Sequence, residues 1–145
     1  MRRMIICSAL WLVLACSDDD SPLLSVAVVT DLQPGVEFGA VRAVLAEGET
    51  LDYVYRSGDD FIDGVRIGTT RVSPGSVTFE VTLLDAGEVV LSRDVVAEVN
   101  GDRSVTVLMT RSCVGVTCPM AGDLAATSCL GGVCVRPECL DGECS

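Results

Sequence analysis

The chain has 145 residues, enough for one ordinary domain or a smaller domain with an appendage. It contains no His and no Lys; all 21 acidic residues lie beyond residue 16, where eight Arg remain, so that part carries a net charge of −13. This charge argues against nucleic acid and anionic lipid surfaces as partners, because both would repel it.

The N-terminal segment is built like an export signal. Arg2 and Arg3 give it a positive start, and residues 4–14 form an apolar run. That run has eleven residues, whereas a membrane-spanning helix needs about 20 apolar residues. We therefore predict that residues 1–15 are a signal peptide that is removed.

The end of this signal carries a lipidation motif. Val13-Leu14-Ala15-Cys16 resembles the lipobox of bacterial lipoproteins, with an aliphatic, a tolerant and a small residue before an invariant Cys, although Leu14 departs from the usual small middle residue. The resemblance implies cleavage before Cys16 and attachment of acyl chains such as palmitate to its thiol. Each buried acyl CH₂ contributes about 0.8 kcal/mol, so two or more chains make attachment effectively permanent. The alternative is an ordinary secretory signal cut after Ala15.

Residues 16–22 read as a lipidated acidic tether. Asp18-Asp19-Asp20 are adjacent like charges that repel one another and extend the chain. Ser17 stands where an inner-membrane retention signal of lipoproteins would place Asp. By that analogy we expect the protein to be localised to the outer membrane.

Residues 23–111 alternate in hydrophobicity with a period of two, and turn residues recur at short intervals. The clearest strand turns Val77, Phe79, Val81 and Leu83 to one side. Asn100-Gly101 predicts a hairpin between the last two strands, since both residues tolerate positive φ. The seven predicted strands are 25–30, 38–46, 51–56, 65–72, 77–83, 88–99 and 103–110.

Seven short strands without a helical period predict an all-β fold, namely an antiparallel sandwich of immunoglobulin or fibronectin type. A core made mostly of Val and Leu suits two sheets about 10 Å apart. The strands contain no Cys, so an antibody-type disulfide is excluded. A small open barrel is the main alternative.

Residues 112–145 form a cysteine-rich tail with little apolar material for a core. In an exported protein, an even number of closely spaced cysteines predicts three disulfides, each worth about 2–4 kcal/mol. The sequence alone does not choose among the many possible pairings. The six residues are Cys113, Cys118, Cys129, Cys134, Cys139 and Cys144.

Metal sites are weakly supported. Zinc fits the tail poorly, because His is absent and six sulfurs exceed a tetrahedral set. Asp59, Asp60 and Asp63 surround a turn, but an EF-hand loop starting at Asp59 would have Phe61 and Thr70 where an oxygen ligand and a Glu are required. A looser calcium site at Asp59–Asp63 stays open, with a solvated loop as the simpler interpretation, and we predict no cofactor.

Catalysis has little support in the sequence. Without His or Lys, a Ser or Cys nucleophile would need an unusual base. No carboxylate pair stands out from the dispersed acidic surface, and the Gly residues do not form a phosphate-binding loop. We predict that the chain is not an enzyme.

Beyond the signal, the chain resembles a group of uncharacterised bacterial surface lipoproteins. In such proteins this region looks like a membrane-proximal module, sometimes followed by a repeat domain that could bind ligands. The chain ends at Ser145, directly after the tail, so we expect no such domain here. The resemblance rests on residues 30–38 (Thr-Asp-Leu-Gln-Pro-Gly-Val-Glu-Phe), 110–119 and 126–139.

The resulting functional expectation is a non-catalytic, lipid-anchored envelope protein that binds another protein or a glycan at the cell surface. The alternative is a structural spacer or assembly subunit of an envelope complex, and a calcium-dependent adhesin is a weaker third possibility. A contiguous apolar patch on one face of the sandwich would favour binding over the spacer.

Overall fold

A computed structural model describes residues 20–120, 122–139 and 143–144. All seven predicted strands are present within these residues. They are β1 (Leu23–Thr30), β2 (Ala40–Leu45), β3 (Thr50–Val54), β4 (Val65–Arg71), β5 (Gly75–Asp85), β6 (Glu88–Val99) and β7 (Arg103–Met109). The tail adds the 3₁₀ turn η1 (Arg111–Cys113) and the short strands β8 (Ser128–Leu130), β9 (Val133–Val135) and β10 (Glu143–Cys144).

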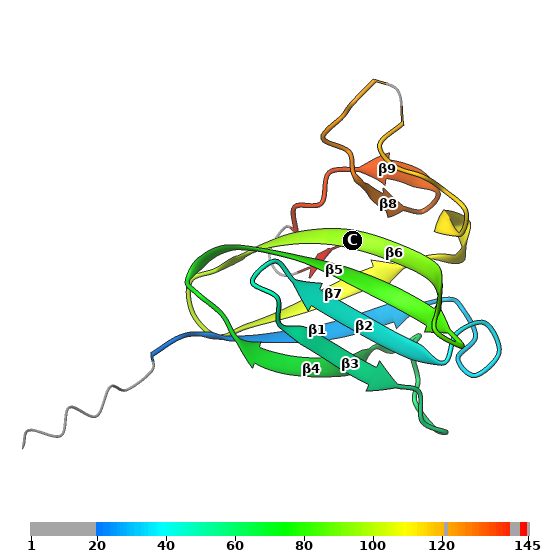
Figure 1. The fold of residues 1–145 in the computed structure, drawn as a ribbon, viewed down its shortest axis with the longest axis horizontal. Helices are drawn as coiled ribbons and strands as arrows, with labels where there is room; N and C mark the ends of the chain where they lie inside the picture. The colour runs from blue at the N-terminus through cyan, green and yellow to red at the C-terminus, as the bar shows by residue number, and fades with distance from the viewer. Residues whose placement is uncertain (1–19, 121, 140–142, 145) are drawn as a thin grey trace, which may run out of the picture.

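Two four-stranded sheets pack face to face (Figure 1). One sheet has the order β10-β7-β1-β4 and the other has the order β3-β2-β5-β6, while β8 and β9 form a small hairpin in the tail. The predicted all-β sandwich with a disulfide-rich tail is confirmed.

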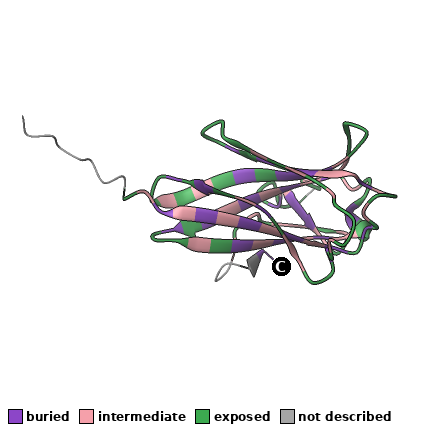
Figure 2. Cartoon of the chain, turned by 90° about the horizontal axis from the view of Figure 1, so that it is seen from below, coloured by how far each residue is buried: buried purple, intermediate pink, exposed green. Residues whose placement is uncertain are grey.

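The core lies between the two sheets, as the alternating sequence predicts. Along β1, β2, β6 and β7 buried residues alternate with more exposed ones, and Figure 2 shows this as bands of colour along the strands. Val is the commonest residue in the core, as at Val26, Val81 and Val107. Phe38 and Phe61 close one end in an edge-to-face contact with ring centroids 5.1 Å apart.

The strand order differs from that of an immunoglobulin constant domain, which keeps its first two strands in one sheet. Here β1 lies between β4 and β7, antiparallel to the first and parallel to the second. The chain then crosses to the other sheet through residues 31–39, where Leu32 and Phe38 are buried. The result is a sandwich with its own connection order.

The predicted hairpin at Asn100-Gly101 is wrong, because β6 and β7 lie in different sheets. The hairpin that pairs β6 is the one at Asp85–Gly87, where Ala86 and Gly87 have φ values of 48° and 89°. A turn sequence can reverse the chain direction, but it does not determine which sheet the next strand joins. The strand β7 pairs with β1, which is distant in sequence.

The tail closes the side of the sandwich where β6 and β7 adjoin. Cys144 of β10 lies opposite Val107 of β7. On β6, the Val96 amide donates to the Pro137 carbonyl and the Val96 carbonyl accepts from the Cys139 amide, both at 2.8 Å. The disulfide Cys139–Cys144, with its Cα atoms 4.5 Å apart, joins these two additions. Both sheets are therefore extended by the tail at this side.

Candidate functional site

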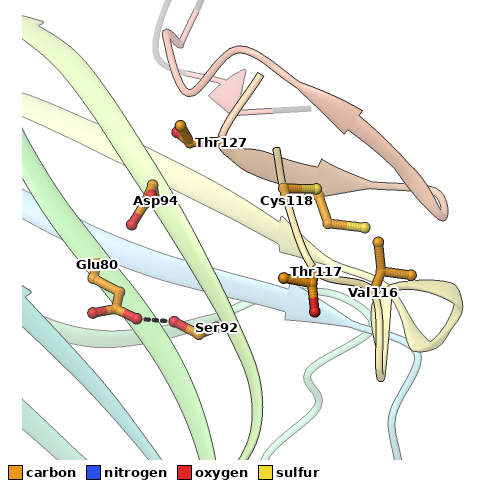
Figure 3. A pocket seen from close by; sticks show the side chains of 8 residues that line it. Glu80, Ser92, Asp94, Val116, Thr117, Cys118 and Thr127 are labelled. Carbon is orange, nitrogen blue, oxygen red and sulfur yellow. Dashed lines mark hydrogen bonds between the residues drawn. The ribbon is translucent and has the colours of Figure 1, made fainter. Parts of the chain in front are cut away.

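An open groove lies between the outer face of the β3-β2-β5-β6 sheet and the tail (Figure 3). Strands β5 and β6 form its floor, and the tail segments around residues 117 and 127 form its wall. Its volume is about 250 Å³. The lining residues are Glu80, Ser92, Asp94, Val116, Thr117, Cys118, Thr127 and Cys129.

Two carboxylates dominate the groove electrostatically. Glu80 and Asp94 are opposite residues in the β5–β6 register, and Ser92 donates a hydrogen bond to Glu80. Partial burial raises the pKa of the Asp94 carboxyl, the Glu80 carboxylate raises it further, and a hydrogen bond with Thr127 opposes both effects. Like charges directly opposite in a sheet are destabilising. A cationic group placed between them would relieve that repulsion.

The groove suits a single polar or cationic group better than a whole small molecule. Ligand pockets usually enclose about 300–1,000 Å³ and are mostly apolar. A pair of carboxylates can act as acid and base, but the lining residues include no cation or amide side chain that would stabilise developing negative charge.

Arg93 is a buried cation that ties the tail to both sheets. It lies in phase with the core-facing residues of β6 and is only 5% exposed. Its Nε donates to Ser128 Oγ at 3.0 Å, and its Nη1 donates to the carbonyls of Leu108 and of Cys144, the latter at 2.6 Å. Burial lowers the pKa of Arg93. One side chain thus links β6 to β7, β8 and β10.

The three predicted disulfides are confirmed. Cys113 bonds to Cys129 and Cys118 to Cys134, with Cα separations of 5.8 and 5.7 Å. Because Cys129 and Cys134 are opposite each other in the β8–β9 hairpin, these two bonds fasten both strands of the hairpin to the segment that precedes it. The third bond, Cys139–Cys144, lies at the side of the sandwich where β6 and β7 adjoin; we call this side the β6–β7 seam.

An apolar row crosses the other end of the same outer sheet face. Val54 lies opposite Ala40, Ala40 opposite Leu84, and Leu84 opposite Val89, so the row spans β3, β2, β5 and β6. Val54 is 70% exposed and Val89 is 65% exposed. Ala40 and Leu84 between them are half-buried.

The loop considered for calcium uses its carboxylates within its own turn. Asp59 accepts hydrogen bonds from the Tyr53 hydroxyl and the Arg56 amide, and Asp60 accepts from the amides of Ile62 and Asp63. Across the described ranges, no group of three or more His, Cys, Asp or Glu side chains is placed to hold a metal ion.

The lipidation prediction at Cys16, the signal at residues 1–15 and the first part of the tether lie outside the described residues. Among the residues that are described, no helix has the length and apolar character needed to cross a membrane.

The chain matches no protein-family model, no curated protein and no solved structure in the comparisons made.

Sequence reasoning did not find the groove, the apolar row or the role of Arg93. The row and the groove join residues of different strands, so they depend on the register between strands. For Arg93 a signal was present: it falls in phase with Leu91, Val95, Ala97 and Val99 of the same strand. An Arg in such an apolar series marks a place where polar groups face the core.

Proposed function

We propose that this chain is a lipid-anchored envelope protein whose sandwich binds another protein at the cell surface without catalysing a reaction. The observation that carries the binding part is the apolar row Val54–Ala40–Leu84–Val89, whose two end residues are exposed and whose two middle residues are half-buried. A spacer needs no such row, because a contiguous apolar surface is costly in water unless a partner covers it.

The location rests on the lipobox at Cys16 and is supported by the three disulfides, which form and persist in oxidising compartments. The geometry of the fold agrees with an anchored display. The tether enters at Leu23 at the start of β1, and the β5–β6 hairpin next to the row lies at the opposite end of the sandwich (Figure 1). The row therefore lies near the end of the sandwich that is farther from the tether.

A protein fits this surface better than a glycan. The row is apolar, whereas the groove that offers carboxylates and hydroxyls has no aromatic side chain among its lining residues on which a sugar ring could stack. We therefore treat glycan binding as one outcome of the test.

The test uses the absence of Lys from the chain. A zero-length carbodiimide couples carboxylates to amines, so in intact cells it joins this acidic chain to Lys-bearing neighbours, while two lipidated copies offer each other no Lys. We expect one discrete protein adduct from the full chain and its loss from a Cys16→Ser variant that is no longer anchored. A full chain that yields no discrete adduct would support the spacer.

Intact mass separates the anchor from the binding claim. We expect mature chains from membranes to begin at Cys16 and to carry acyl chains, and their six tail cysteines to alkylate only after reduction. A mature chain that starts elsewhere without lipid would overturn the anchor, whatever the adducts show.

A further inference from the structure

The apolar row lies on the outside of the sandwich. Val41 and Leu83, which adjoin Ala40 and Leu84 along their strands, are buried in the core. Val89 is two residues from the buried Leu91, and a register shift after Leu83 places it opposite Leu84. Directly opposite residues in an antiparallel pair have Cβ atoms about 4.5–5.5 Å apart, so the side chains touch their neighbours across the four strands. The row forms a continuous strip about 14 Å long, given the usual spacing of strands.

Acidic residues flank the strip along β5 and β6. Asp85 and Glu88 are exposed, follow Leu84 and precede Val89, and pair with each other in the β5–β6 register. On the other side lies the groove with Glu80 and Asp94. Four residues along a strand separate Leu84 from Glu80, which is about 13 Å.

The one basic side chain between these features is already compensated. Arg42 lies on the same outer face, and its Nε is 2.6 Å from Asp52 Oδ1. Across the described ranges, no ion pair engages Asp85, Glu88, Glu80 or Asp94. The strip is therefore apolar with net negative charge at both borders.

This charge pattern selects among the possible occupants. A second copy would bring the same acidic borders from a chain whose residues beyond 16 carry a net charge of −13, and an anionic lipid surface would be repelled in the same way. A partner with apolar side chains between Lys or Arg residues matches both the strip and its borders. Such complementarity steers association and fixes the register of the contact.

We propose that the outer face of the β3-β2-β5-β6 sheet docks a basic protein partner. The row Val54–Ala40–Leu84–Val89 receives the partner's apolar side chains. The pair Asp85–Glu88 and the groove pair Glu80–Asp94 receive Lys or Arg side chains. This inference rests on the proposed binding function and gives it a surface and a partner chemistry.

The test places a photo-crosslinking amino acid at Val54 or at Val89 in the full lipidated chain, in the cells that produce it. Val133, which is 60% exposed on the β8–β9 hairpin, is the matched control position. We expect the same protein adduct from Val54 and Val89 and none of it from Val133. Mass spectrometry of the adduct should find the label on an apolar residue close to Lys or Arg.

Charge reversal then tests the borders. Asp85→Lys with Glu88→Lys should lower the adduct yield on the order of tenfold, as expected for the loss of a few attractive charges. Exposed hairpin residues seldom affect folding, and retention of the three disulfides would check this.

The possible failures are distinguishable. A protein adduct from Val133 alone would keep the binding function and overturn this surface. Adducts to a second copy, to lipid or to glycan from Val54 and Val89 would overturn the partner chemistry, as would an adduct whose yield survives the charge reversal. Absence of any protein adduct from all three positions would overturn this surface, and the binding function falls with it only when the carbodiimide adduct is absent as well.

Discussion

The two sides of the sandwich where the edges of the sheets meet, β3 with β4 and β6 with β7, are held together by different contacts. Between β3 and β4 the sheets approach so closely that a Cβ atom on Gly68 would lie 3.0 Å from Leu51 Cδ2. A hydrogen bond from the Thr70 hydroxyl to Glu49 adds a polar contact there. Between β6 and β7 the closure is made by Arg93 and the disulfide-bonded tail.

The difference shows that the tail is part of the sandwich. The short strands β3 and β4 close their side by direct packing of Gly68 on β4 against Leu51 on β3. The longer strand β6 runs beside β7 without pairing with it, so both edges would carry unpaired backbone groups. Such edges are sites of unwanted strand pairing, and here the tail pairs with both.

The largest effect is expected from Arg93→Ala. The change removes a buried cation and leaves the carbonyls of Leu108 and Cys144 without this donor, so we expect a loss of about 3 kcal/mol in unfolding free energy. Urea unfolding of a soluble chain starting at Ser17 measures it. Arg66→Ala, at an exposed position on β4, serves as the control with little change expected. A loss below about 1 kcal/mol for Arg93→Ala would mean that the cation does not hold the seam.

The disulfides should differ in where they act. Chain entropy alone predicts a loss of about 2 kcal/mol on removing Cys139–Cys144 and about 3 kcal/mol on removing Cys118–Cys134, whose loop is longer. We expect faster hydrogen exchange at the Val96 amide when both residues of Cys139–Cys144 are replaced by Ala, because that amide bonds to Pro137 in the tail. If exchange at the Val96 amide is unchanged, or is equally fast in the Cys118/Cys134 variant, then the Cys139–Cys144 disulfide does not specifically hold the tail against β6.

At the packed seam, Gly68→Ala should cost about 1 kcal/mol, because the new methyl group must displace the Leu51 side chain. The matched control is Gly101→Ala, where no atom lies within 4 Å of the added carbon. Thermal unfolding of the two variants compares them directly. Equal midpoints would show that the β3–β4 approach is loose.

The smallest effect is expected from Asp94→Asn. The pKa of Asp94 is raised in the folded chain, so its ionised form destabilises the fold as the pH rises from the ordinary value of 3.8 through the raised value. The Asn variant should therefore be more stable at neutral pH by a fraction of a kcal/mol, since solvent screens much of the effect. Below pH 3.8 the difference should vanish.

The measurement is the stability of both chains across this pH range, with Glu98→Gln on the same sheet face as the control. A constant difference at all pH values would show that ionisation of Asp94 is not its cause.

The sequence predicted the strands because alternation is a local signal. The fifth strand follows the pattern over most of its length: Phe79, Val81 and Leu83 are buried and Thr78 and Glu80 are exposed, while Thr82 is buried as well. The even number of cysteines likewise predicted three disulfides. Each of these inferences needs only neighbouring residues and the chemistry of the compartment.

The remainder depended on contacts between distant parts of the chain. The hairpin prediction at Asn100-Gly101 failed because β7 pairs with β1, which no local pattern reveals. Spacing could not choose the disulfide partners, and the groove exists only because the tail folds back over β5 and β6. The apolar row requires the register of four strands, since Val54 and Val89 are ordinary exposed residues when considered separately.

The most direct test of the closed seam is the unfolding free energy of a chain that runs from Ser17 to Arg111, compared with the chain from Ser17 to Ser145. The shorter chain keeps all seven long strands and loses the tail. We predict that it loses about 5 kcal/mol or more, a loss comparable to the whole stability of many small domains, or that it does not unfold cooperatively. Equal unfolding free energies for the two chains would contradict the account and make the tail a separate appendage.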